Sequence, residues 1–342
     1  MSRRVLLAHT GGTIGMHRGP RGFEPRQGHL ADLLARMPEL KDPSMPEVTL
    51  VEWGPLLDSA DNRPADWRRM AHEIAARYDQ IDGVVLLHGT DTMAYTSSAL
   101  SFLLEGLGKP VIVTGSQVPL AEVRSDAREN LVASLQLAAR TDLHEVCVYF
   151  SGQVLRGCRA TKVSASGFDA FESPNEPPLG QVGVDIALRA SGPRPPQAGP
   201  LRVPPLADVT VASLRLFPGI DARFVRHVLQ EPLQGLVLET FGTGNAPSRD
   251  RELLAALAEA TERGVVIVNI TQCLRGRVDM AGYATGRALQ DLGVVGGADM
   301  TPEAALTKLI YLLGSGHDAA AARELMQRDL RGELTPDAAG PA

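Results

Sequence analysis

Short apolar runs alternate with segments of helical periodicity along most of this 342-residue chain, and this alternation restricts the fold more than any other feature. Several runs lack the in–out alternation of a half-exposed strand, so both of their faces are expected to be covered, as in a parallel sheet. Strands are predicted at Arg4–His9, Val48–Glu52, Gly83–His88, Val111–Thr114, Val146–Phe150, Val209–Leu216, Gly235–Glu239 and Val265–Ile270. Helices are predicted at Leu30–Arg36, Ala65–Tyr78, Ala94–Glu105, Ala127–Arg140, Arg223–Leu229 and Arg251–Arg263. This order predicts a doubly wound α/β protein with right-handed crossovers.

A proline-rich stretch interrupts the pattern. Ser191–Pro205 holds six prolines in fifteen residues, and so dense a run excludes a helix interior or a central strand. We expect a semi-rigid linker over residues 191–207. It separates an N-terminal α/β domain, residues 1–190, from a smaller C-terminal α/β domain, residues 208–342. The chain is long enough for two cores of ordinary size.

Two helix starts carry capping signals in the C-terminal part. Ser248 is predicted to cap the helix that begins Arg249-Asp250-Arg251-Glu252. Thr301 is predicted to cap the next strongly apolar helix, with Pro302 at its first position.

Composition limits the partners and the compartment. The apolar fraction of 44% and the net charge of −6 are typical of a soluble globular protein and argue against nucleic acid or an acidic membrane as partner. No signal-like segment and no apolar stretch of membrane-spanning length is present. The three cysteines, Cys147, Cys158 and Cys273, lack metal-ligand spacing and are expected to be free thiols in a reducing cytoplasm. We expect no metal and no cofactor.

Three predicted strands end in the same way, with a glycine followed by a residue that carries a hydroxyl or a carboxylate group. Paired glycines after a buried strand allow a sharp turn and the close approach of another group. In a doubly wound sheet such strand ends converge on one crevice, where ligands bind. Convergence would bring together Thr13, Thr90, Asp91 and Ser116. The three blocks are Thr10-Gly11-Gly12-Thr13-Ile14-Gly15, His88-Gly89-Thr90-Asp91-Thr92 and Thr114-Gly115-Ser116-Gln117.

Each candidate residue also has a purely structural interpretation. Thr13 fits a turn or cap position, and Asp91 fits the N-cap of the helix that follows it. Lys162 fits an ordinary exposed lysine, while His9 and His88 fit packed residues at strand ends. The first glycine turn lacks both the P-loop ending and the Gly-x-Gly-x-x-Gly spacing, so nucleotide binding is unsupported.

The first two blocks, in this order, resemble the signature motifs of the bacterial-type L-asparaginases. Met16 after the first block and Met93-Ala94-Tyr95 after the second are similar to the cytoplasmic, type I branch. The resemblance implies an N-terminal flavodoxin-like domain, a smaller C-terminal α/β domain, and a homodimer or homotetramer. It covers nearly the whole chain and continues through Leu57-Asp58-Ser59, Val113–Gln117, Gly167–Phe171, Gly242–Pro247 and Gly282–Gly286.

The resemblance also implies roles for individual residues. Thr13 resembles the nucleophile that attacks a side-chain amide, which would give an acyl-enzyme and ammonia. A threonine hydroxyl needs a neighbouring base, and a lysine serves as base only when its pKa is lowered. The residues that resemble the second triad are Thr90, Asp91 and Lys162, and those that resemble substrate-binding positions are Gly12, Asp58, Ser59, Thr90, Asp91 and Ser116.

One position departs from the family pattern. Phe23 stands where the family usually carries a tyrosine on the mobile loop after the first motif. Phenylalanine keeps the ring but lacks the hydroxyl that would hydrogen-bond Thr13. Tyr283 is a candidate source of a replacement phenol.

The leading functional hypothesis is hydrolysis of L-asparagine to L-aspartate and ammonia. A broader amidohydrolase that acts on L-glutamine, D-asparagine or a small peptide amide remains open, because one methylene changes selectivity by only about 1–3 kcal/mol. Two further alternatives are the amidase component of a tRNA-dependent amidotransferase and a catalytically weakened, asparagine-binding regulatory protein.

Overall fold

The computed structural model describes residues 2–20, 22–190, 192, 194–195, 197, 199–282 and 284–336. The chain forms two compact units, Met1–Val203 and Pro204–Ala342. The division falls inside the stretch predicted as a linker, after Arg202, which pairs with Glu105 of the first unit through two backbone hydrogen bonds. Each unit is described by itself.

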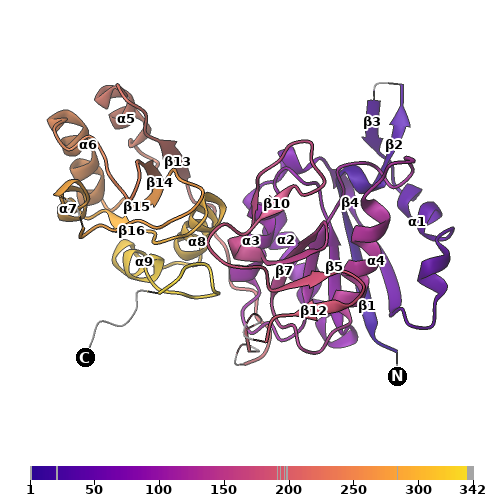
Figure 1. Ribbon diagram of the computed structural model, residues 1–342. Helices are drawn as coiled ribbons and strands as arrows, with labels where there is room; N and C mark the ends of the chain where they lie inside the picture. The colour runs from indigo at the N-terminus through magenta and orange to yellow at the C-terminus, as the bar shows by residue number, and fades with distance from the viewer. Residues whose placement is uncertain are drawn as a thin grey trace. The chain divides into compact units, whose positions relative to one another are not determined.

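The first unit is built around an eight-stranded sheet in the order β12-β11-β8-β7-β6-β5-β1-β4 (Figure 1). Strands β4, β1, β5, β6 and β7 are parallel neighbours. Numbered along the chain they follow the order 2-1-3-4-5, which is the flavodoxin-like arrangement; this confirms the predicted fold class. Strands β8, β11 and β12 extend the sheet in antiparallel fashion. The bounds are β1 (Arg4–Gly11), β4 (Glu47–Leu57), β5 (Gly83–Leu87), β6 (Val111–Thr114), β7 (Val146–Phe150), β8 (Gln153–Arg156), β11 (Gly180–Val182) and β12 (Ile186–Leu188).

Helices cover both faces of this sheet, as the unbroken apolar strands require. Helices α2 (Pro64–Ala75) and α3 (Met93–Leu103) pack on one side, and α1 (His29–Leu34) and α4 (Ala127–Ala138) on the other (Figure 1). Alternate residues of the strands, such as Val5 and Leu7, share one buried cluster with α1 and α4. The doubly covered sheet is therefore a rigid support for the loops at its edge.

A short hairpin that the sequence pattern does not predict follows the first strand. Its strands, β2 (Met16–Gly19) and β3 (Gly22–Pro25), pair antiparallel, and Figure 1 shows them standing away from the main sheet. The segment is rich in glycine and charge and buries little, so it carries none of the apolar signal that marks a core strand.

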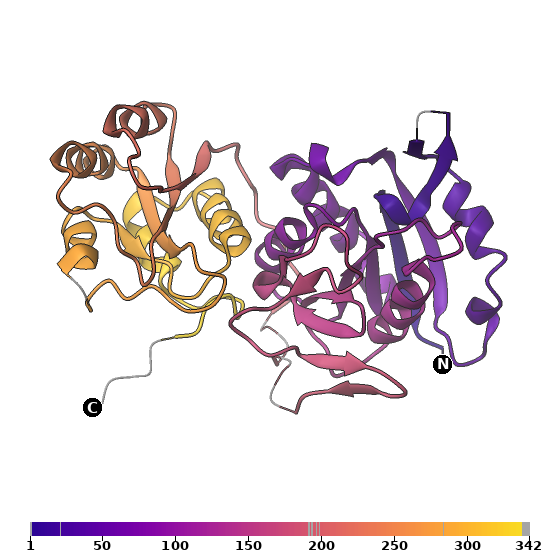
Figure 2. The same ribbon diagram turned by 45° about the horizontal axis from the view of Figure 1, so that its top comes forward.

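The second unit contains a parallel sheet in the order β13-β14-β15-β16, and Figure 2 shows its helices on both sides. Its bounds are β13 (Val211–Arg215), β14 (Gly235–Thr240), β15 (Val266–Thr271), β16 (Val295–Gly296), α5 (Ala222–Val228), α6 (Arg251–Glu262), α7 (Ala284–Asp291), α8 (Pro302–Gly314) and α9 (Ala319–Met326).

The two predicted helix caps have opposite outcomes. Thr301 caps α8, where its hydroxyl accepts a hydrogen bond from the Ala304 amide at 3.2 Å. The prediction for Ser248 is wrong, because α6 is capped by Asp250, whose carboxylate accepts from the Leu253 amide at 3.0 Å. Asp250 stands directly before the helix and reaches the third helical amide, whereas Ser248 lies two residues too early.

No helix among the described residues is both long enough and apolar enough to cross a membrane.

Candidate active site

The candidate site lies where the strand order of the first sheet reverses, between β1 and β5. Ligands bind outside the carboxyl ends of parallel strands at such a point. The chain leaves β1 at Gly11 and forms a short 3-10 turn over Thr13–Gly15. It leaves β5 at Leu87 and continues into His88–Asp91. The first two glycine blocks therefore emerge side by side.

Close backbone contacts hold three loops together at this point. A Cβ atom on Gly12, whose φ is +83°, would lie 2.4 Å from the Gly89 nitrogen, and a Cβ atom on Gly89 would lie 2.5 Å from the Ser59 hydroxyl. Only glycine fits such approaches. In addition, the Thr10 hydroxyl donates to the Leu87 carbonyl at 2.9 Å. The first motif, the second motif and the loop after β4 thus form one packed unit.

Thr13 is the first residue of the 3-10 turn and is partly exposed. Its hydroxyl forms no hydrogen bond within the described part of the chain, and Gly12, not Thr13, occupies the N-cap of the turn. Thr13 is therefore a turn residue, as one interpretation of the sequence expects, but its hydroxyl does not cap the turn.

Lys162 brings the second motif and a distant strand together. Its ammonium nitrogen lies 2.8 Å from the Thr90 hydroxyl and 2.7 Å from a carboxylate oxygen of Asp91. The lysine side chain is 17% exposed, so it is not the ordinary exposed lysine that composition favours. Asp91 is not the helix cap either, because Thr92 occupies the N-cap of α3.

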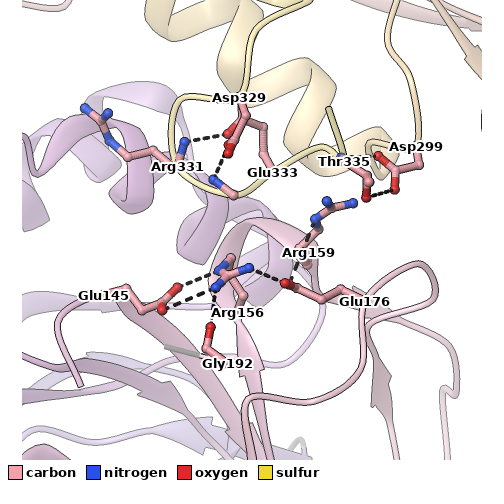
Figure 3. Close-up of polar contacts among 12 residues, drawn as sticks. Glu145, Arg156, Arg159, Glu176, Gly192, Asp299, Asp329, Arg331, Glu333 and Thr335 are labelled. Atoms are coloured by element: carbon pink, nitrogen blue, oxygen red, sulfur yellow. Dashed lines mark hydrogen bonds and ion pairs between the residues drawn. The ribbon is translucent and has the colours of Figure 1, made fainter. Parts of the chain in front are cut away.

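A buried ion cluster supports the segment that carries Lys162. This residue lies in β9 (Thr161–Lys162), which pairs with β10 (Phe171–Glu172) and follows the turn Gly157–Arg159 after β8. Figure 3 shows Arg156 between Glu145 and Glu176. The Arg156 Nε lies 2.6 Å from Glu145 Oε2. The Ser97 hydroxyl of α3 donates to the Gly157 carbonyl at 3.0 Å. The start of the turn is therefore fixed to the core.

The predicted substrate-binding residues lie around the same loops. Asp58 is exposed, and its carboxylate caps the 3-10 turn Ser59–Asp61 by accepting from the Ala60 amide at 3.0 Å. The buried Ser59 accepts through its carbonyl from the Thr92 hydroxyl at 2.8 Å. Ser116, after β6, is 1% exposed, and its hydroxyl has no hydrogen-bond partner among the described residues.

The sequence favours only a packed role for His88, and the structure gives it a more specific place. Its Nδ1 lies 2.7 Å from the Gly89 carbonyl, and its Nε2 lies 2.9 Å from the Thr96 hydroxyl and 2.7 Å from the Asn62 amide nitrogen. Burial lowers the pKa of this imidazole to about 4, so the ring is neutral at pH 7. It links the Gly89–Asp91 turn to α3.

Gln117 is a site residue that the sequence reasoning missed, although it directly follows Ser116 in the third block. Its side-chain oxygen accepts a hydrogen bond from the Thr90 hydroxyl at 3.1 Å. The available signal is its position at a strand end, but nothing in the spacing indicates which strand-end side chains meet.

The structure describes Phe23, the position that lacks the family's phenol, but not Tyr283, the candidate source of a replacement. Phe23 lies on β3, which contacts the turn that holds Thr13. This residue is 43% exposed, and the guanidinium carbon of Arg18 lies 4.7 Å from the centroid of its ring. Tyr283 lies outside the described residues.

The three cysteines are free thiols. Cys147 and Cys158 are buried, and Cys273 is exposed; none is in a disulfide. Over the described ranges, no group of three or more His, Cys, Asp or Glu side chains is arranged to hold a metal ion.

The first unit thus combines a flavodoxin-like sheet with a threonine-bearing glycine turn and a Lys–Thr–Asp cluster at the switch point of the sheet. The family description "Asparaginase, N-terminal" matches residues 4–194, and "Glutaminase/Asparaginase C-terminal domain" matches residues 210–326. The chain therefore belongs to the asparaginase family, which confirms the predicted resemblance.

Individual relatives agree with this assignment. The chain is 52% identical to L-asparaginase 1 of Escherichia coli (strain K12), over 98% of this chain and 99% of that protein. It matches the crystal structure of L-asparaginase I from Vibrio cholerae with a TM-score of 0.91 and 47% identity, over 98% of this chain and all of that one. It is also 36% identical to the L-asparaginase of Thermococcus kodakarensis, over 97% of this chain and 99% of that protein.

Proposed function

We propose that this protein is an L-asparaginase that hydrolyses L-asparagine to L-aspartate and ammonia through an acyl-enzyme on Thr13. The observation that carries the proposal is the contact of Lys162 with both Thr90 and Asp91, next to the Gly12 turn at the switch point of the sheet. The identity of 52% to an L-asparaginase along nearly the whole chain supports the same reaction.

In the proposed mechanism the Thr13 hydroxyl attacks the carbon of the substrate's side-chain amide. The threonine proton must pass to a base, because a neutral hydroxyl is a weak nucleophile. Negative charge then develops on the amide oxygen, and backbone N–H groups of the glycine turns are the candidate donors that stabilise it. The base returns this proton to the amide nitrogen, the C–N bond breaks and ammonia leaves, so that a β-aspartyl ester remains on Thr13. A water molecule then hydrolyses this ester to aspartate.

Lys162, Thr90 and Asp91 form the proton-handling group of this proposal. Lys162 acts as the base, and Thr90 relays a proton or holds the water molecule. Asp91 has two roles: it orients the lysine, which it contacts at 2.7 Å, and it holds the α-amino group of the substrate. The 68% exposure of its carboxylate side chain is compatible with the second role.

The remaining predicted residues bind the substrate in this proposal. Asp58 and Ser59 hold the α-amino and α-carboxylate groups, and Gly12 allows the reacting amide to approach the backbone. Ser116 lies near the leaving amide; an unpaired buried hydroxyl such as this one costs free energy until it finds a partner.

We further propose that the protein works in the cytoplasm as a homodimer or homotetramer without a metal or cofactor, and that it acts on neither nucleic acid nor membranes. Residues 1–190 would form the catalytic domain, residues 191–207 the linker and residues 208–342 the C-terminal domain. The net charge of −6 supports a small-molecule substrate over an RNA partner.

The test is ammonia release from L-asparagine, L-glutamine and D-asparagine by the wild type and Thr13→Ala. We expect the wild type to favour L-asparagine and the variant to lose activity. Comparable rates on L-glutamine or D-asparagine would favour a broader amidohydrolase. Wild-type inactivity on all three substrates would refute the asparaginase proposal and favour a binding or regulatory protein. Full activity of Thr13→Ala would indicate that Thr90, and not Thr13, is the nucleophile.

A further inference from the structure

Gln117 bridges two loops of the candidate site through its side-chain amide. Its Oε1 lies 3.1 Å from the Thr90 hydroxyl, and its Nε2 donates to the Gly167 carbonyl at 2.9 Å. Thr90 belongs to the loop after β5 and Gly167 to the loop between β9 and β10.

The donor and acceptor capacities of the groups fix the direction of each hydrogen bond in the series Gly167–Gln117–Thr90–Lys162. A backbone carbonyl only accepts, so the amide end that faces Gly167 is the NH2 group and the end that faces Thr90 is the oxygen. That oxygen also only accepts, so the single O–H of Thr90 points to Gln117. The lone pairs of the Thr90 hydroxyl therefore face the Lys162 nitrogen, 2.8 Å away, and the lysine is the donor.

The backbone of Gln117 is itself firmly held. Its amide donates to both carboxylate oxygens of Asp126, at 3.1 and 3.0 Å, and the next amide, of Val118, donates to the same carboxylate at 3.0 Å. Asn130 reaches Asp126 at 3.2 Å and the Gly115 carbonyl at 3.0 Å. An acceptor on so well-anchored a loop is pre-organised for the Thr90 hydroxyl.

We propose that Gln117 is a positioning residue that keeps the Thr90 hydroxyl pointed away from Lys162. The inference rests on the proposed function, because it assigns a role within the same proton-handling group. With Gln117 in place, Thr90 accepts a hydrogen bond from Lys162, and this arrangement favours the charged amine. Before Thr90 can pass a proton to Lys162, its O–H must leave Gln117. Gln117 thereby controls when the Thr90 hydroxyl is free to pass a proton to Lys162.

Other ionisable groups act on the same site and must stay constant in the test. Asp91 pairs with Lys162 directly, Asp126 lies under the Gln117 backbone, and a Cβ atom on Gly167 would lie 2.6 Å from an oxygen of Asp169. Substitutions at Gln117 leave all three carboxylates in place, so a shift of the pH profile reports the change at residue 117.

The experiment compares the pH dependence of kcat for the wild type, Gln117→Leu and Gln117→Glu. Leucine removes the acceptor, so the Thr90 O–H turns to Lys162 and the alkaline-rising limb moves to lower pH by about 0.5–1 unit. Glutamate keeps the acceptor and adds negative charge, so the same limb moves to higher pH. KM should change less than kcat. Gln181→Leu, at an exposed position of β11, is the matched control and should leave the profile unchanged.

A second measurement does not depend on activity. Acylation of Lys162 by a small anhydride, followed by peptide mass spectrometry, gives the pH midpoint at which the free amine appears. We expect that midpoint to fall in Gln117→Leu and to rise in Gln117→Glu. Equal midpoints in the wild type and Gln117→Leu would overturn the inference even if the protein hydrolyses no asparagine. If both variants had a lower kcat but their pH midpoints did not move in opposite directions, Gln117 would have only a structural role.

Discussion

The buried imidazole of His88 is expected to make the folded protein lose stability in mild acid. Burial lowers its pKa from 6.5 to about 4, so the folded-state value lies below the unfolded-state value. Above pH 6.5 the ring is neutral in both states and its titration has no effect on stability. As the pH falls below 6.5, the unfolded chain binds a proton that the folded protein does not bind, and the unfolded state gains in relative free energy.

The two pKa values set the size of the effect. Between pH 7 and pH 5 the free energy of unfolding should fall by about 2 kcal/mol through His88 alone. The full loss, about 3 kcal/mol, is reached below pH 4. His88→Gln removes the titrating group but keeps an amide that can donate to the Gly89 carbonyl, so the variant should lack this dependence.

The assay is urea unfolding of the wild type and His88→Gln at both pH values and at one protein concentration. The difference between the free energies of unfolding of the wild type and of His88→Gln should be about 2 kcal/mol smaller at pH 5 than at pH 7. His9, whose pKa burial also lowers, is present in both proteins and cancels. His72→Gln, at an exposed position of α2, serves as control. If this difference in the free energy of unfolding were the same at pH 7 and pH 5, the assignment of a buried, neutral His88 would be refuted.

Three further substitutions test other parts of the account. Phe23→Tyr should raise the rate of the first ammonia release in single-turnover kinetics, because it restores a phenol; no change or a loss would show that no hydroxyl is missing. Gly12→Ala should reduce kcat/KM at least tenfold, about 1.4 kcal/mol, because its Cβ would meet the Gly89 backbone at 2.4 Å; wild-type kinetics would contradict this. Arg156→Met should destabilise the protein by about 3–5 kcal/mol in urea unfolding, since the buried Glu145 would lose its charged partner; a loss below about 1 kcal/mol would contradict it.

The sequence predicts the central strands because their physical signal is strong and local. Val111–Thr114 and Val146–Phe150 are buried on both faces, and their predicted bounds match β6 and β7. The hairpin β2–β3 and the short strands β11 and β12 at one end of the sheet escape prediction, since short, partly exposed strands do not need an unbroken apolar run.

The candidate site is predictable in its parts but not in its contacts. The glycine blocks mark the strand ends, and the resemblance to a family draws attention to Lys162, which local sequence presents as an ordinary lysine. The bonds from Lys162 to Thr90 and from Thr90 to Gln117 join residues 72 and 27 positions apart. They depend on strand order and on the path of the loop after β8, neither of which spacing along the chain encodes.

The central claim is that Thr13 carries the acyl group, and rapid quenching tests it most directly. The wild type is mixed with excess L-asparagine, quenched in acid during turnover, digested and examined by peptide mass spectrometry. We expect a β-aspartyl ester on Thr13 in the wild type, and no such ester in Thr13→Ala. An ester on Thr90 instead, or wild-type rates of ammonia release from Thr13→Ala, would contradict it.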